Sequence, residues 1–296
     1  MTSADKRFYK YLTVGEEDKH WGIYVTGAGH IQIPPKTEYP LVDDPSHHYF
    51  HWAVGRRISE YQILYITRGQ GTFESERSGS HRIGTGDAFI LFPGIWHRFR
   101  PDENTGWDEY WVEFDGNLIR HYHERDFLSP ENPVIKAGIE EAIAKNYLSI
   151  IKLIRDEKPG FQYIASGMLL QIVGQLMAFK KYQVFEGRNI ETQIRQAKLF
   201  IMENLHLSFS QEDLAKKMGL GYSLYRKKFR EYTGVSPAQY HIQLRINKAK
   251  DLLITTSESF KELALELGFE STDYFFRLFR QKTGFTPSEF REKNKR

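Results

Sequence analysis

The chain contains no cysteine, which excludes disulfide bonds and thiolate metal sites. It also lacks any uninterrupted apolar stretch close to the roughly 20 residues that a membrane-spanning helix requires. Its first residues, Met1 to Lys6, carry no apolar core of a secretion signal. These absences predict a protein of the cytoplasm with no part in a membrane.

A strong excess of one charge is absent too, because the 296 residues carry a formal net charge of only +3. The charges are unevenly distributed, however. Residues 191–296 hold 19 Lys and Arg against 13 Asp and Glu, a balance of +6, which leaves −3 for the rest. A basic segment joined to a mildly acidic one predicts that one end of the chain binds a polyanion.

The basic segment contains an internal repeat. The landmarks of the first copy are Leu214-Ala215, Gly219, Phe229 and Thr233-Gly234, and those of the second are Leu263-Ala264, Gly268, Phe279 and Thr283-Gly284. The offset is 49 residues as far as the Gly219/Gly268 pair and 50 afterwards, which predicts one extra residue near Glu270. Each copy therefore predicts a short helix, a glycine turn and a second helix.

Local signals mark where these helices begin. Ser210 and Ser259 are expected N-caps, and Glu262 completes a capping box with Ser259. Further helices are predicted to begin at Ser236-Pro237 and Thr286-Pro287, where proline suits the first helical position. Apolar stripes predict a long helix joining the copies and another in front of them: Ile242, Ile246, Ala249 and Leu253, and Ile194, Ala197 and Ile201.

A helix, a glycine turn and a second helix can place a recognition helix in the major groove of DNA, although two hairpins that merely pack would share the pattern. The second helices, 223–230 and 272–280, favour DNA because they carry polar and basic residues at helical spacing with aromatic residues behind. RNA is a weaker alternative, because no RNA-binding motif is present.

Residues 191–296 resemble the DNA-binding domain of the AraC/XylS family of bacterial transcription regulators. The signature is Ala264-x3-Gly268-Phe269-x5-Phe275-x3-Phe279-Arg280-x3-Gly284-x-Thr286-Pro287. The resemblance implies two helix-turn-helix units bridged by a long helix, with both recognition helices in successive major grooves of double-stranded DNA. By position, the base-facing residues would be Ser223, Arg226, Lys227, Thr272, Asp273 and Arg277. The phosphate-facing residues would be Lys228, Arg230 and Arg280. Tyr225 replaces the family's usual leucine and is expected in the core.

Short strands separated by turns dominate residues from about 21 to 114, as in runs 62–66, 88–92 and 109–114. They predict a sandwich or barrel such as a jelly roll. The string Gly86-Asp87…Phe92-Pro93-Gly94-x2-His97 resembles the second motif of cupin barrels, which are common sensor domains in the AraC family.

Metal-binding cupins supply an H-x-H pair and a carboxylate, whereas the matching stretch here runs from Arg56 to Gln62 without histidine. His97 alone cannot hold a catalytic metal. His47, His48 and His51 could together bind a metal, but they are more simply explained as solvated loop residues. We therefore expect no metal and no cofactor. A barrel rich in aromatic residues suits a small polar effector such as a sugar. The candidate ligand-binding residues are Trp21, Tyr24, Arg57, Trp96, His97, Glu109 and Trp111, although for each aromatic an ordinary place in the core is the more common role.

Two amphipathic helices are predicted over 139–156 and 161–182, and they could pair two subunits, as in AraC relatives, or cover the barrel of their own chain. The predicted fold is a two-domain α+β chain with a cupin-like β-barrel plus helices and an all-α double helix-turn-helix domain. The expected organisation is a sensor domain (1–138), a helical dimerisation or packing segment (139–182), a linker (183–190) and a DNA-binding domain (191–296).

This organisation predicts a ligand-responsive, sequence-specific transcription regulator and not an enzyme. Its expected partners are double-stranded DNA, a small-molecule effector, a second copy of the chain and, for an activator, RNA polymerase. Two alternatives are a metal-dependent cupin enzyme fused to a DNA-binding domain and a DNA-binding protein that responds to no ligand. The missing H-x-H pair counts against the first alternative, and stabilisation by a small molecule would count against the second.

Overall fold

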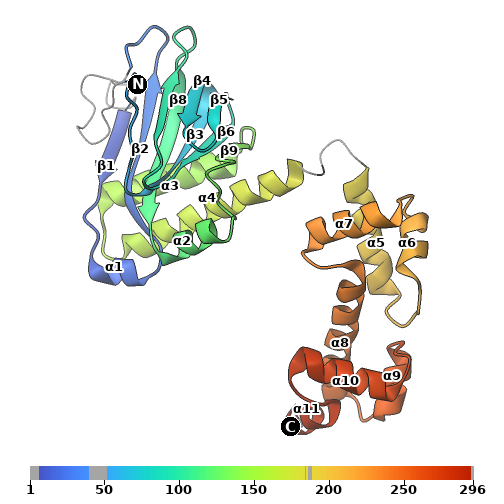
Figure 1. Ribbon diagram of the computed structural model, residues 1–296. Coiled ribbons are helices and arrows are strands. Elements are labelled where there is room, and N and C mark those ends of the chain that lie inside the picture. The colour runs from blue at the N-terminus through green and yellow to red at the C-terminus, as the bar shows by residue number, and fades with distance from the viewer. Residues whose placement is uncertain (1–6, 40–51, 184, 186–188, 295–296) are drawn as a thin grey trace. The chain divides into compact units, whose positions relative to one another are not determined.

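The computed structural model describes residues 7–39, 52–183, 185 and 189–294. The chain divides into two compact units, Met1–Gln183 and Val184–Arg296. Figure 1 shows the elements of each unit.

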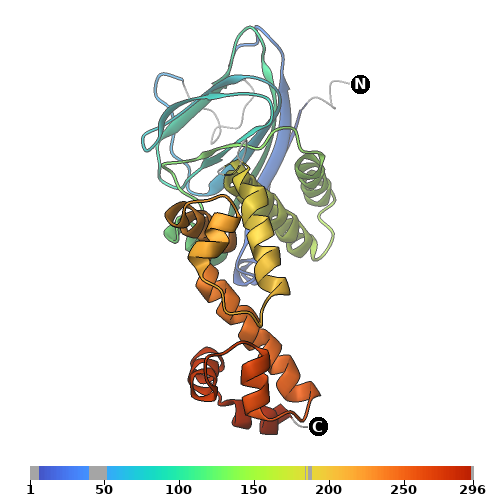
Figure 2. The same ribbon diagram turned by 90° about the vertical axis from the view of Figure 1, so that its right-hand side faces the viewer.

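The N-terminal unit is built on two antiparallel sheets, which confirms the predicted barrel-like fold. The larger sheet has the order β1 (Arg7–Tyr11), β2 (Tyr24–Ile33), β8 (Trp107–Asp115), β3 (Tyr61–Gly69), β6 (Asp87–Leu91) and β9 (Val134–Lys136). The smaller sheet has the order β5 (Gly79–Ile83), β4 (Gly71–Ser75) and β7 (His97–Pro101). Viewed from the side, the strands wrap around an interior (Figure 2).

Strand β3 shows why the larger sheet is buried on both faces. Leu64 and Ile66 pack inward with residues of the smaller sheet, whereas Tyr61, Ile63 and Tyr65 join a second cluster on the outer face. Successive side chains of a strand point to opposite faces. A strand buried on both sides therefore carries a continuous apolar run.

The described residues of this unit also form four helices: α1 (Glu16–His20), α2 (Asn117–Glu124), α3 (Glu141–Asp156) and α4 (Phe161–Gln183). Helices α3 and α4 cover the outer face of the larger sheet in their own chain, where Tyr147 and Leu169 are fully buried. The Gln162 side chain accepts a hydrogen bond from the backbone N–H of Val25 (3.1 Å) and donates one to its carbonyl oxygen (2.8 Å). Gln162 thus satisfies both backbone groups of a strand residue, as a neighbouring strand would.

The C-terminal unit is all-α, as predicted. It contains α5 (Ile190–Glu203), α6 (Gln211–Lys217), α7 (Tyr222–Thr233), α8 (Pro237–Thr255), α9 (Phe260–Glu266), α10 (Thr272–Thr283) and α11 (Pro287–Asn294). The predicted N-caps are confirmed, since the Ser210 and Ser259 hydroxyls accept hydrogen bonds from the N–H groups of Asp213 and Glu262. Ser236 and Gln239 form a further capping box at the start of α8.

The repeat is visible in the structure as two helix-turn-helix units, α6–α7 and α9–α10. Gly219 and Gly268 occupy equivalent turns with φ of +70° and +69°, a region that costs glycine little. The extra residue of the second copy lies in its turn, because α7 begins after Gly221 and α10 begins after Ser271. The shift of offset near Glu270 is therefore confirmed.

Candidate functional site

Helix α7 presents a basic stripe on one face. Ser223, Arg226, Lys227 and Arg230 are exposed, and all four line a shallow depression together with Tyr222, Glu231 and Gly234. These positions follow the three- and four-residue steps of a helix face. Tyr225 and Phe229 lie on the opposite side in the apolar core, as expected for Tyr225.

Lys228 differs from the prediction. It is 8% exposed, and its ammonium group forms an ion pair of 2.6 Å with Glu231 and lies 5.4 Å from the centre of the Phe185 ring. Its place three residues after the buried Tyr225 turns it toward the core. The structure therefore gives no support to the expected phosphate contact by Lys228.

Helix α10 repeats the arrangement with a different charge pattern. Arg277 and Arg280 are exposed, and Thr272 is half-buried at the first turn. Phe275 and Phe279 face the core. Asp273 is exposed in the first turn, where a negative charge interacts favourably with the helix dipole. That interaction gives Asp273 a structural reason to be present on a helix that otherwise exposes basic residues.

The interior of the N-terminal unit contains a second group of polar residues. On β8, Glu109 and Glu113 share a strand face with Trp107 and Trp111, which pack in the inner cluster. Glu109 and Trp111 are each 4% exposed. The sequence analysis predicts that Glu109 and Trp111 line the barrel, and in the structure both lie on the inner face of β8.

Two glycines of β2 make room for the Trp111 indole. A β-carbon at Gly29 would lie 2.8 Å from atoms of that ring, and one at Gly27 would lie 3.3 Å from it. Tyr11 stacks on the same indole, with ring centres 5.6 Å apart and planes inclined by 27°. An aromatic surface thus lies against a strand that has no side chains at these two positions.

Arg56 is the basic residue of this interior, and sequence reasoning missed it. It forms an isolated β-bridge with His97, and its Nε donates to the Nε2 of His97 at 3.3 Å. Because a guanidinium only donates, Nε2 accepts, and Nδ1 of a neutral His97 donates to the carbonyl oxygen of Ile95 at 3.1 Å. Burial lowers the pKa of Arg56, while the nearby tyrosines Tyr39 and Tyr11 and the carboxylates of Glu113 and Glu109 oppose that shift.

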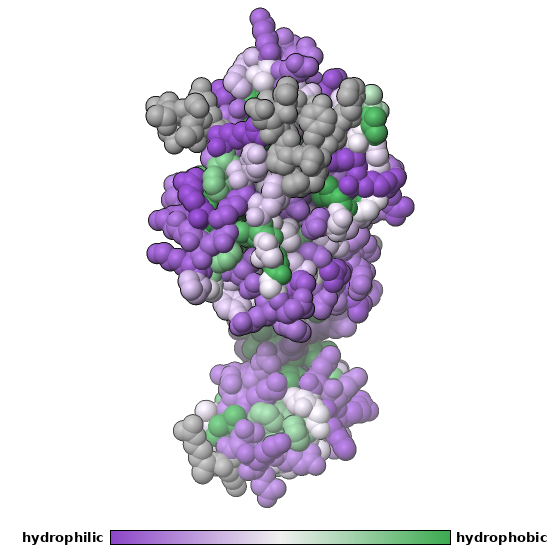
Figure 3. Space-filling view, turned by 90° about the vertical axis from the view of Figure 1, so that its left-hand side faces the viewer, coloured by the Kyte–Doolittle hydropathy of each residue, from purple (hydrophilic) through white to green (hydrophobic). Residues whose placement is uncertain are grey.

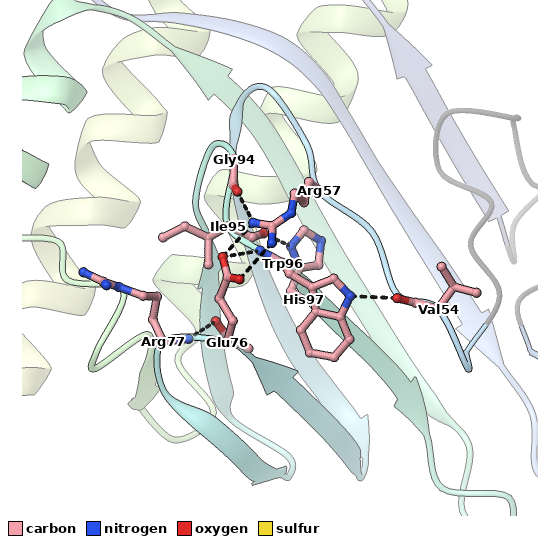
Figure 4. Close-up of polar contacts among 9 residues, drawn as sticks. Val54, Arg57, Glu76, Arg77, Gly94, Ile95, Trp96 and His97 are labelled. Atoms are coloured by element: carbon pink, nitrogen blue, oxygen red, sulfur yellow. Dashed lines mark hydrogen bonds and ion pairs between the residues drawn. The ribbon is translucent and has the colours of Figure 1, made fainter.

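Arg57 is half exposed and lies beside Glu76 and Gly94 (Figure 4). Its guanidinium binds both carboxylate oxygens of Glu76, at 2.6 and 2.8 Å, and donates to the carbonyl oxygen of Gly94. The hydrogen bonds from Arg57 and from the Trp96 backbone N–H lower the pKa of Glu76 to about 2. The Trp96 indole donates to the carbonyl oxygen of Val54 at 2.7 Å. Arg57 and Trp96 therefore stabilise the loop around Val54 and Gly94 through hydrogen bonds.

Trp21 and Tyr24 also lie away from the interior residues. Trp21 is 58% exposed and packs on Tyr163 of α4 with ring centres 4.8 Å apart. The Tyr24 hydroxyl is 3.5 Å from a carboxylate oxygen of Asp115. Of the seven candidate ligand-binding residues, the structure thus brings together His97, Glu109 and Trp111.

Among the described residues, no group of three or more His, Asp or Glu side chains could hold a metal ion. His47, His48 and His51 lie outside the described residues. The described helices include none with the length and apolarity needed to cross a membrane.

The chain matches two family models, that of an AraC-like ligand binding domain over residues 40–173 and that of a helix-turn-helix domain over residues 214–293. It is 25% identical to the MmsAB operon regulatory protein of Pseudomonas aeruginosa, over 82% of this chain and 78% of the relative. It is 27% identical to the lactose operon transcription activator of Staphylococcus xylosus, over 80% and 87%. It is also 27% identical to the arabinose operon regulatory protein of Escherichia coli, over 77% and 80%. The chain therefore belongs to the AraC family of transcription regulators, with a cupin-like ligand-binding domain followed by a helix-turn-helix DNA-binding domain.

Proposed function

We propose that α7 and α10 enter successive major grooves of double-stranded DNA. The observation that carries this proposal is the exposed stripe of Ser223, Arg226, Lys227 and Arg230 on α7, matched on α10 by Arg277 and Arg280. Ser223, Arg226 and Lys227 would face bases, as would Thr272, Asp273 and Arg277. Arg230 and Arg280, which lie at the later turns of their helices, would contact phosphates.

Salt dependence tests this mode of binding. Wild-type full-length protein is used to select DNA from a randomised duplex library, and its affinity for the enriched sequence is measured between 50 and 200 mM salt. Neutralised phosphates release counterions, so the logarithm of the association constant should fall linearly with the logarithm of salt concentration. A failure to enrich any sequence, or an affinity that is constant over this range, would contradict the proposal.

For the N-terminal unit, we propose a neutral polar effector with sugar-like chemistry, bound without a metal. The support is the combination of an aromatic surface, Trp111 with Tyr11, and hydrogen-bonding groups on the same interior, Arg56, His97 and Glu109. Aromatic faces cover C–H surfaces, while the polar groups would pair with hydroxyl groups. Two buried carboxylates, Glu109 and Glu113, disfavour an anionic ligand. The relatives named for lactose and arabinose operons make a carbohydrate the first class to test.

A thermal-shift screen of the full chain against mono- and oligosaccharides identifies the effector, since a ligand that binds the folded state raises the melting temperature. The neighbouring residues Arg56 and Arg57 then provide a matched pair. Arg56→Ala should weaken binding of the identified effector by about tenfold to a hundredfold, because a buried polar partner is lost. Arg57→Ala should change it little. Equal effects of the two variants would contradict this site, and a stoichiometric transition metal in purified protein would contradict binding without a metal.

We also propose that the protein is a homodimer through the outer face of α4. Ile164 is 54% exposed there, and Gly167 and Gly174 on the same stripe have open space beside them. Glycine in a helix interior lowers helix stability by about 1 kcal/mol relative to alanine. Close approach of a second helix would explain why α4 carries glycine at both positions. Sedimentation should give a dimer for the wild type and a monomer for Ile164→Glu, whereas Lys145→Glu on the exposed face of α3 is the control that should stay dimeric.

A further inference from the structure

The C-terminal unit contains two separate apolar cores. One joins α5, α6 and α7 with Tyr240 and Leu244 of α8. The other joins α9, α10 and α11 with residues of α8 from Ile242 to Leu253. Among the described residues, α8 is the only helix that contributes to both cores. The relative orientation of α7 and α10 would therefore depend on α8 alone, unless another contact links the first helix-turn-helix unit (α6–α7) to the second (α9–α10).

Arg245, in the middle of α8, provides such a contact. Its Nε donates to the carbonyl oxygen of Leu205 at 2.6 Å, and its Nη2 donates to that of Leu207 at 2.9 Å. These carbonyls belong to the segment between α5 and α6, in the first unit. The same guanidinium lies 5.6 Å from the centre of the Phe269 ring, in the turn that precedes α10 of the second unit.

Gly268 brings the two segments together from the other side. A β-carbon at this position would lie only 2.2 Å from the carbonyl oxygen of His206 and 2.7 Å from an Nη atom of Arg245. The equivalent turn of the first unit has no such neighbour, since the nearest atom to a β-carbon at Gly219 would be 3.5 Å away, on Gln193. The absence of a side chain at Gly268 thus lets the turn of the second unit press against the 205–207 segment of the first.

We propose that Arg245, with Gly268 beside it, is a positioning residue that locks the two helix-turn-helix units in the orientation needed to read both halves of one DNA site. This inference rests on the proposed entry of both recognition helices into DNA. Two linked modules gain affinity only when their geometry allows both to bind at once. A rigid link makes that gain depend on the spacing between the half-sites.

The test uses full-length protein and the duplex that wild-type protein enriches from a randomised library. A second duplex carries one extra base pair between the two halves, which rotates one half-site by about 35° relative to the other. We expect the insertion to weaken wild-type binding by about tenfold to a hundredfold, because the second module can no longer engage. For Arg245→Ala, we expect weaker binding to the parent duplex and a penalty for the insertion of about threefold or less.

Arg291→Ala is the matched control. Arg291 also donates to a backbone carbonyl, that of Leu253 at 3.3 Å, and lies 4.6 Å from the Phe260 ring centre, but both partners belong to the second core. The Arg291→Ala variant should keep the wild-type spacing penalty, which is the loss of affinity caused by the extra base pair between the half-sites. A folded Arg245→Ala protein that keeps the full penalty would overturn the positioning role while leaving two-groove binding intact. A wild-type protein without any spacing penalty would also overturn the rigid link, and two-groove binding itself would be contradicted if Arg277→Ala on α10 left the affinity for the parent duplex unchanged.

A second pair of variants covers the case in which Arg245→Ala does not fold. Gly219→Ala and Gly268→Ala impose the same left-handed backbone strain at equivalent turns, but only the second places a methyl group against His206. The spacing penalty should fall in Gly268→Ala and stay at the wild-type value in Gly219→Ala. Equal penalties in the two variants would overturn the proposal.

Discussion

His241 should make the stability of the C-terminal unit depend on pH. It is 7% exposed, and its ring stacks on the Phe209 ring with ring centres 4.8 Å apart. Its Nε2 is 3.2 Å from the carbonyl oxygen of Leu205. Burial lowers its pKa to about 4, the positive charge of Arg245 adds to the decrease, and the hydrogen bond to Leu205 opposes it. Because the folded-state pKa lies below the ordinary value of 6.5, the unfolded chain binds the proton more tightly.

The sign and size of the effect follow from this difference. Stability is fully present above about pH 6.5 and falls as the pH decreases toward about 4. A full shift of about 2.5 pKa units corresponds to about 3.4 kcal/mol, of which about 2 kcal/mol would be lost at pH 5. We therefore expect a loss of about 1 to 2 kcal/mol between pH 7.5 and pH 5.

Urea unfolding of the full chain at both pH values measures this loss, with His241→Gln as the comparison. Glutamine keeps an N–H donor near the Leu205 carbonyl but does not titrate. The five tryptophans all lie at or before Trp111, so indole fluorescence reports the N-terminal unit, while circular dichroism also follows the helices of the C-terminal unit. The extra pH dependence should appear in the dichroism of the wild type alone. An identical pH dependence in the variant would refute the reasoning.

Three further predictions follow from the same structure. Arg226→Ala and Arg277→Ala should each relax the preference for particular base pairs, by about 1–3 kcal/mol per lost contact, whereas Arg230→Ala should weaken binding to all sequences alike; uniform losses across a site library would exclude base contacts. Gly29→Ala should lower effector affinity in calorimetry, because its methyl group would lie 2.6 Å from the backbone carbonyl oxygen of Phe8 and 2.8 Å from the indole of Trp111, so that this surface must shift; unchanged affinity would exclude this strand from the site. Tyr147→Phe removes a buried hydrogen bond of 3.2 Å and should lower the urea midpoint of the fluorescence transition by an amount equivalent to about 1 kcal/mol; an unchanged midpoint would show that the bond contributes nothing.

The helices of the C-terminal unit could be predicted from the sequence because their determinants are local. A cap such as Ser259 is recognised by Glu262 three residues later, and the turn glycines mark where each short helix ends. Even the burial of Lys228, which the sequence analysis did not predict, had a local signal. It lies at the i+3 position from Tyr225 and next to Phe229, which together define the buried face of α7.

The barrel interior could be predicted only where a regular strand carries the residue. Glu109 and Trp111 alternate with outward residues on β8, so their shared face follows from strand periodicity. Arg56 and Arg57 lie in irregular backbone that holds only an isolated bridge, where no such alternation applies. Which of the two neighbours points inward is decided by their partners, His97 and Glu76, which lie 41 and 19 residues further along the chain.

Strand β1 was not predicted, and its contribution to the interior depends on pairing between distant segments. Tyr11 pairs with Gly27 of β2, and Gly29 pairs with Trp111 of β8. In the sequence, glycine within a strand indicates only a weak strand or a bulge. Once the register brings an indole opposite Gly29, the missing side chain becomes the feature that makes room for the aromatic surface. The aromatic surface that would contact an effector is therefore set by strand register, whereas the residues that would contact DNA are set by helical periodicity within each of the twelve-residue helices α7 and α10.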